Sequence, residues 1–110
     1  MTKEDQRKHN RVGVSLNVQW QSATGKYTAR CADISPEGCY IDSIAPMQEG
    51  KRISIDVQLP TGRWLPLRGE IVKHQPNSGF GVRFLELPES SRMMLEHLIM
   101  YAREDEAEES

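Results

Sequence analysis

Residues that bind metals or perform covalent catalysis are scarce in this sequence of 110 residues. It contains two cysteines and three histidines, and aromatic residues make up 6% of it. Because His9, His74 and His97 are scattered and no Cys-x-x-Cys pair exists, the residue spacing of a zinc site is missing. No nucleophile has the spacing that would align it with a base, so we expect neither an enzyme nor a bound cofactor.

Long apolar runs are also absent. Hydrophobic residues make up 37% of the chain, its mean hydropathy is −0.61, and no run approaches the roughly 18 apolar residues of a membrane span. The charged residues 1–8 lack the apolar stretch of a signal peptide. We therefore expect one soluble domain in the cytoplasm, long enough to bury a single core.

The two cysteines, Cys31 and Cys39, flank a polar loop and stand in apolar, strand-like contexts. A disulfide across a hairpin is one interpretation. Two buried free thiols are the favoured one, because a reducing compartment keeps cysteines unpaired and a buried cysteine packs as a small apolar residue.

The two ends of the chain differ in composition from its middle. Residues 1–13 carry almost no apolar side chain, which predicts a flexible arm, and residues 14–103 hold the expected barrel and helix. Residues 104–110 form an acidic segment, interpreted as a disordered tail; the alternative is that it competes with anions for a basic site. The net charge of −2 hides this asymmetry, because residues 1–103 carry 14 basic and 11 acidic side chains, a net of +3.

Alternation of apolar and polar side chains predicts a β-rich domain. In residues 14–20 and again in residues 53–59, every second side chain is apolar, which is the period of a half-buried strand. Turn residues such as glycine, proline and asparagine separate these segments from others like them. The expected strands are residues 14–20, 26–32, 38–44, 51–59, 64–74 and 80–84.

The apolar period changes after Pro88. Apolar residues then recur at three- and four-residue spacing, which predicts an amphipathic helix of roughly 15 residues ending near Arg103. Its methionines 93, 94 and 100 are expected to fill gaps against the barrel, with an adaptable partner surface as the alternative. The whole pattern indicates a small, six-stranded antiparallel β-barrel with a C-terminal α-helix.

Two short motifs point to a ligand. Asp33-x-Ser35-x-x-Gly38 describes a compact polar loop that caps a hairpin, and Arg7 and Arg11 stand four residues apart. Two arginines at this spacing can both reach a doubly charged anion, so the pair of motifs indicates a phosphate-bearing ligand. The alternatives are that Asp33 and Ser35 only close a turn and that the arginines are solvated surface charges.

Both motifs, in this order, resemble those of the PilZ domain, the bacterial receptor module for cyclic di-GMP (c-di-GMP). The segment Gly79-Phe-Gly-Val-Arg-Phe84 is similar to the final strand of that family. The resemblance implies that Arg7 and Arg11 contact phosphates and guanine, and that Asp33 accepts hydrogen bonds from a guanine edge. Ser35 would bond a phosphate or steady the loop, and Gly38 would leave room for the backbone.

The sequence departs from the family pattern in two places. Many PilZ domains stack a tryptophan on a guanine late in the fifth strand, where Lys73 or His74 stands here. Lys8 and Lys73 are therefore additional candidate ligand contacts. Gln6 replaces the basic residue that accompanies binding of a ligand dimer, which favours one ligand molecule. Trp20 and Trp64 are expected in the core or at a barrel end.

The resemblance predicts a stand-alone, ligand-gated module without catalysis. Binding of c-di-GMP would order the arm and create a surface read by an unidentified downstream protein, in motility, adhesion or biofilm control. The alternative is a PilZ-like adaptor that binds protein but no nucleotide. DNA or RNA binding is not expected, because the net charge of +3 is modest and no aromatic platform is evident.

Overall fold

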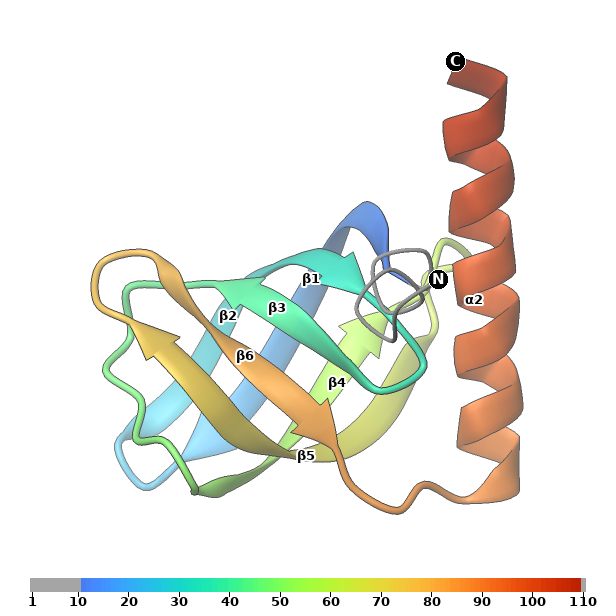
Figure 1. Cartoon of the computed structure of the whole chain (residues 1–110). Helices are drawn as coiled ribbons and strands as arrows, with labels where there is room; N and C mark the ends of the chain where they lie inside the picture. Colours follow the sequence, from blue (N-terminus) through green and yellow to red (C-terminus); the bar gives the residue numbers. More distant parts are fainter. Residues whose placement is uncertain (1–10, 110) are drawn as a thin grey trace, which may run out of the picture.

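Residues 11–109, the part of the chain that this computed structural model describes, form a closed antiparallel barrel of six strands followed by one helix (Figure 1). The elements are β1 (Val12–Ser22), β2 (Gly25–Ile34), β3 (Gly38–Asp42), β4 (Arg52–Gln58), β5 (Trp64–Gln75), β6 (Gly79–Phe84) and α2 (Glu89–Glu109). Around the barrel the strand order is β1-β2-β3-β6-β5-β4. The predicted fold class is confirmed.

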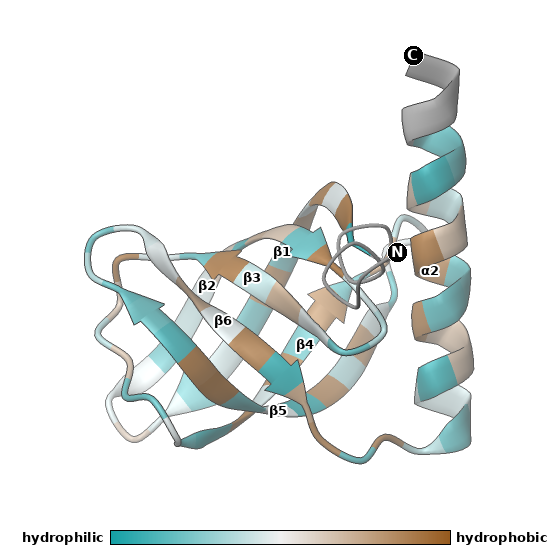
Figure 2. Cartoon of the chain, viewed as in Figure 1, coloured by the Kyte–Doolittle hydropathy of each residue, from teal (hydrophilic) through white to brown (hydrophobic). Residues whose placement is uncertain are grey.

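The strand alternation seen in the sequence builds the core. Along β5, Leu65 and Leu67 are buried while Pro66 and Arg68 are exposed, and Figure 2 shows the same banding of apolar and polar residues on the other strands. Phe80 is fully buried at the centre and meets the ring of Trp20 edge-on, with the ring centroids 5.5 Å apart. Each large side chain buried in this way contributes about 1.5–3 kcal/mol.

The helix lies across one end of the barrel and packs against β1 and β5 (Figure 1). Its buried face consists of Leu95, Leu98, Ile99 and Ala102. Met94 is half-buried against the core, as expected, whereas Met93 and Met100 are exposed. The opposite end of the barrel, formed by the β1–β2 and β5–β6 turns and the β3–β4 loop, is not covered by the helix.

Both ends of the domain extend further than the sequence predicted. β1 begins at Val12, so the last two residues of the expected arm belong to the barrel. α2 spans 21 residues, and residues 104–109, expected in a disordered tail, continue the helix. Alanine and glutamate favour helical backbone and no glycine or proline interrupts the segment 89–109, so nothing in the local sequence ends the helix at Arg103.

The cysteine and tryptophan predictions have clear outcomes. Cys31 and Cys39 are free and buried, as favoured from the sequence. Trp20 belongs to the core with 3% of its surface exposed, while Trp64, at the start of β5, is 40% exposed.

Candidate functional site

Ser35 organises the loop that joins β2 to β3. Its backbone N–H donates to the Gly38 carbonyl at 2.8 Å, and its hydroxyl accepts hydrogen bonds from the backbone N–H groups of Glu37 and Gly38 at 3.2 and 3.3 Å. The Ser35 residue itself is only 5% exposed. A side chain that accepts from the backbone two and three residues ahead fixes a turn, so this loop is shaped before any ligand arrives.

Gly38 is required by space rather than by an unusual backbone angle. It pairs with Arg83 across the β3–β6 ladder, where a Cβ would collide with the Val82 carbonyl oxygen. The carbonyl of Glu37 also accepts a hydrogen bond from the Phe84 backbone N–H at 2.7 Å. The loop is therefore held directly against the backbone of β6.

Asp33 and Arg11 face each other beside this loop. Arg11 Nη1 lies 3.8 Å from Asp33 Oδ1, and the arginine side chain is 60% exposed. Asp33 Oδ1 is buried yet has no hydrogen-bond partner among the described residues. Register shifts next to Asp33, in both the β1–β2 and β2–β3 ladders, interrupt the regular pairing there. A buried acceptor without a hydrogen bond is unusual in a folded protein, so this atom is a candidate acceptor for an incoming donor.

A surface hollow of about 300 Å³, here called the motif hollow, adjoins the loop. Arg11 and Arg83 both line it, so two arginines that are far apart in the sequence border one space. Arg83 also lies 3.5 Å from Glu70 in an ion pair. The other lining residues are Ser35, Glu37, Gly38, Cys39, Val72, Gly81 and Val82.

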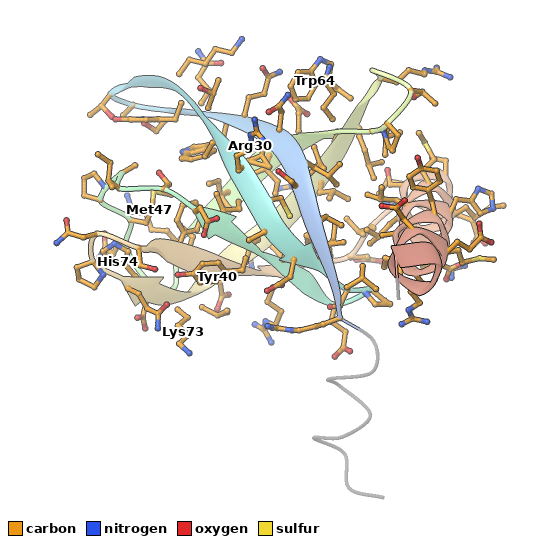
Figure 3. All side chains as sticks on the ribbon, turned by 90° about the horizontal axis from the view of Figure 1, so that it is seen from above. Arg30, Tyr40, Met47, Trp64, Lys73 and His74 are labelled. Carbon is orange, nitrogen blue, oxygen red and sulfur yellow. The ribbon has the colours of Figure 1, made fainter. Side chains whose placement is uncertain are left out.

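The β5 side of the motif hollow differs from the sequence expectation. The β5–β6 register shifts between Ile71 and Lys73, so Val72 is the extra residue, and it lines the hollow with 44% of its surface exposed. Lys73 is not among the described residues that line the hollow. Figure 3 shows its side chain pointing outward from the barrel, on the side away from Arg30 and Trp64.

Cys39 lies on the inner wall of the motif hollow. A side-chain hydrogen bond with Cys31 and burial raise the pKa of the Cys39 thiol well above its ordinary value, and the charge of Asp33 acts in the same direction. Cys39 is therefore a neutral packing residue at neutral pH.

Of the residues predicted from the sequence, Arg11, Ser35 and Gly38 line the motif hollow, and Asp33, which is not among its lining residues, is linked to it through the ion pair with Arg11. Arg7 and Lys8 lie outside the described residues. Arg83 and Val72 were missed. The sequence held a signal for Arg83, because it alternates with Gly81 along β6 and so lies on the same face of the strand that pairs with Gly38. It held no signal for Val72, because the bulge in β5 changes which side chain faces outward.

Among the described residues, no group of three or more histidine, cysteine, aspartate or glutamate side chains is placed to hold a metal ion. In the same part of the chain, no helix has both the length and the apolar character needed to cross a membrane.

The family model of the PilZ domain matches residues 5–101, so this chain belongs to the PilZ domain family. No curated protein matches the sequence significantly.

Solved structures agree on the fold. The PilZ domain of YcgR from Escherichia coli, solved with c-di-GMP, superposes with a TM-score of 0.75 at 17% identity, covering 90% of this chain and 92% of that one. The longer E. coli YcgR in complex with c-di-GMP gives 0.73 at 22% identity, covering 90% and 46%. The Bacillus subtilis inhibitor of motility MotI/DgrA gives 0.71 at 14% identity, covering 91% and 50%. This chain thus spans about half the length of the last two.

Proposed function

We propose that this protein is a receptor for c-di-GMP and that the ligand binds at the motif hollow. The single observation that carries the proposal is the buried Asp33 Oδ1, which has no hydrogen-bond partner among the described residues, in an ion pair with Arg11 and next to a loop already fixed by Ser35. Membership of the PilZ family and the c-di-GMP bound to the PilZ domain of YcgR support it.

The chemistry of the hollow suits a cyclic dinucleotide. c-di-GMP offers phosphodiester oxygens to arginine and offers guanine N–H donors to a carboxylate. In this assignment Asp33 accepts from a guanine N1–H and amino group, while Arg11 and Arg83 pair with phosphate or stack on a base. Gly38 allows the loop to pack against the backbone of β6, and Ser35 holds the loop. Arg7, together with Lys8, is assigned to the ligand from the sequence motif alone.

Relay to a partner follows from the position of Arg11. It stands immediately before β1, so a ligand held by Arg11 would fix how the chain enters the barrel. We propose that residues 1–10 dock over the ligand and that a downstream protein in the cytoplasm reads the resulting surface of protein and nucleotide. Motility or biofilm control is the expected setting.

The test is a calorimetric titration of the purified protein with c-di-GMP, with GTP and cyclic di-AMP as control ligands. We expect selective binding that Arg11→Ala weakens by about tenfold or more, the effect of losing a hydrogen bond to a charged group. Arg30→Ala is the matched control, since Arg30 lies on β2 and its guanidinium donates to Ser15 Oγ at 2.7 Å instead of lining the hollow. If Arg11→Ala bound c-di-GMP as tightly as the parent protein and Arg30→Ala do, Arg11 would not belong to the site.

A nucleotide-independent adaptor is the second candidate. The observation that favours it is Val72, because an aliphatic side chain offers no ring for base stacking on the β5 side of the hollow. No heat of binding and no shift of Tm with c-di-GMP would support this adaptor.

A further inference from the structure

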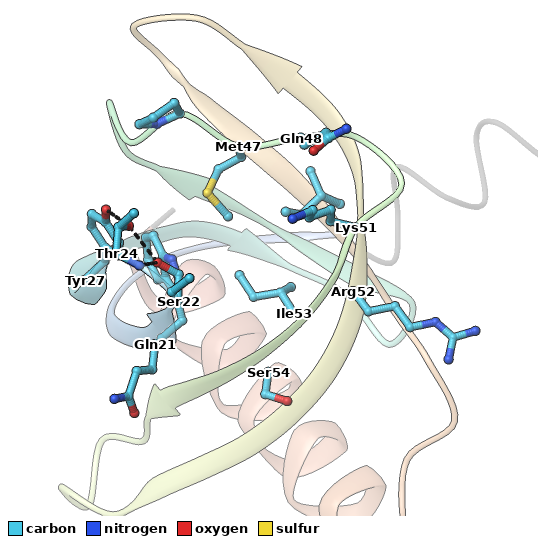
Figure 4. Close-up of a pocket in the computed structure, with 14 residues that line it drawn as sticks. Gln21, Ser22, Thr24, Tyr27, Met47, Gln48, Lys51, Arg52, Ile53 and Ser54 are labelled. Carbon is cyan, nitrogen blue, oxygen red and sulfur yellow. Dashed lines mark hydrogen bonds between the residues drawn. The ribbon is translucent and has the colours of Figure 1, made fainter.

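A second hollow, here called the distal hollow, opens at the barrel end that the helix does not cover (Figure 4). Its volume is about 620 Å³, which lies within the range of small-molecule sites. The β1–β2 hairpin forms one wall and the β3–β4 loop forms the other. Asp33 and the loop at Ser35 lie at the other end of β2 from this hairpin, so the two hollows are separate.

The floor of the distal hollow is apolar and aromatic. Trp20 stacks on Tyr27 with the ring centroids 5.6 Å apart, and Met47, Ile53 and Ile71 complete the apolar surface. The Trp20 indole N–H is buried and has no hydrogen-bond partner among the described residues. A buried donor without an acceptor costs free energy, so an acceptor atom that came within hydrogen-bond distance of this N–H would be stabilised.

One cation stands over this floor. In Figure 4 the Lys51 side chain lies beside Met47 above Ile53, whereas the guanidinium end of Arg52, which also lines the hollow, points away from it. Within the described part of the chain, Lys51 makes no ion pair. Its backbone is fixed, because the Ile71 N–H donates to the Lys51 carbonyl at 2.8 Å. Lys51 is exposed, and its side chain lies over apolar surface without a counter-charge among the described residues.

We propose that the distal hollow is a binding site for a small organic acid with an apolar body. Its carboxylate or sulfonate would accept from Lys51, its apolar body would cover Met47 and Ile53, and a further acceptor atom would meet the Trp20 indole N–H. The assignment is independent of c-di-GMP binding and adds a second ligand class to this domain.

The probe is 8-anilinonaphthalene-1-sulfonate, an aromatic sulfonate that fluoresces when it enters an apolar site. The titration uses the full chain carrying Trp64→Phe, so that Trp20 is the only tryptophan and energy transfer reports on it alone. We expect saturable 1:1 binding that Lys51→Ala weakens by about tenfold. Lys26→Ala is the control, because Lys26 lies on β2 in the same hairpin but is not among the described residues that line the distal hollow, and this variant should bind normally.

Two results would overturn the proposal. One is the absence of saturable probe binding to the Trp64→Phe protein when its far-ultraviolet circular dichroism and Tm match those of the parent protein. The other is binding that Lys51→Ala leaves intact and Tyr101→Ser abolishes, which would place the probe on the exposed face of α2. Asp33→Ala serves as a further control and should leave the probe affinity unchanged, because Asp33 is not among the residues that line the distal hollow.

Discussion

Asp33 and Ser35 stand two residues apart in one motif, yet the contacts of their side chains differ. Ser35 is buried and bonded to three backbone groups of its own loop. Asp33 has only the 3.8 Å ion pair with a largely exposed arginine, and its buried Oδ1 has no hydrogen-bond partner among the described residues. Replacing each with alanine should therefore separate stability from binding.

The magnitudes differ enough to measure. Exposed ion pairs contribute about 0–1 kcal/mol, and removing a buried acceptor that has no hydrogen bond offsets part of that loss, so Asp33→Ala should change Tm by less than about 4 °C. Ser35→Ala leaves the N–H groups of Glu37 and Gly38 without their acceptor, which should cost about 2 kcal/mol and lower Tm by about 8 °C. Binding of c-di-GMP should weaken by more than about tenfold in Asp33→Ala, because hydrogen bonds to a carboxylate are worth about 1.5–3 kcal/mol.

The assay pairs thermal unfolding without ligand with calorimetry in its presence. Asp33→Asn is the conservative control, since it keeps one acceptor oxygen but loses the charge, and its affinity should fall between those of the parent and Asp33→Ala. The reasoning is refuted if Asp33→Ala lowers Tm as far as Ser35→Ala does. It also fails if Asp33→Ala binds c-di-GMP with unchanged affinity.

Other substitutions around the motif hollow test the packing and charges described above. Gly38→Ala should lower the unfolding free energy by about 1–3 kcal/mol in a urea titration. Gly81→Ala should cost much less, because its Cβ would meet only side-chain carbons at 3.6 and 3.7 Å. Similar losses in the two variants would contradict the close approach of β6 to Gly38. Arg83→Ala should weaken c-di-GMP binding by about tenfold, and an unchanged titration would limit its role to the Glu70 ion pair. The free energy of unfolding should fall as pH rises above about 9.0, because the Cys39 thiol then loses its proton in the unfolded chain, whereas its raised pKa in the folded protein keeps the proton bound. Cys39→Ala should flatten this dependence of stability on pH. Equal slopes in the parent and the variant would exclude the thiol as its origin.

The fold was largely predictable from the sequence because burial alternates along most of each long strand, outside the bulges of β2 and β5. Leu65 and Leu67 are buried in the register that the pattern gave, and the turns fall where glycine and proline interrupt it. The end of the helix was not predictable from the apolar period, since that period stops at Ala102 while the backbone continues to Glu109. Helical propensity, which the acidic residues retain, decides that boundary.

The candidate site was predictable only where the motif is local. Ser35 and Gly38 act through neighbours in the chain and across one ladder, so their spacing already carried the geometry. Trp20 illustrates the opposite case, because a burial pattern says that it belongs to the core but cannot say that its N–H lacks a partner. That depends on side chains from distant strands.

The bulge in β5 shows why alignment to a motif misses part of a surface. Counting along the strand placed Lys73 or His74 at the stacking position, but one extra residue at Val72 puts an aliphatic side chain against the motif hollow. Valine can cover a base but cannot supply a ring, whereas the flat guanidinium groups of Arg11 and Arg83 can stack on one. If c-di-GMP binds here, we therefore expect stacking to fall to arginine, and Val72→Trp should then tighten binding by restoring an aromatic face.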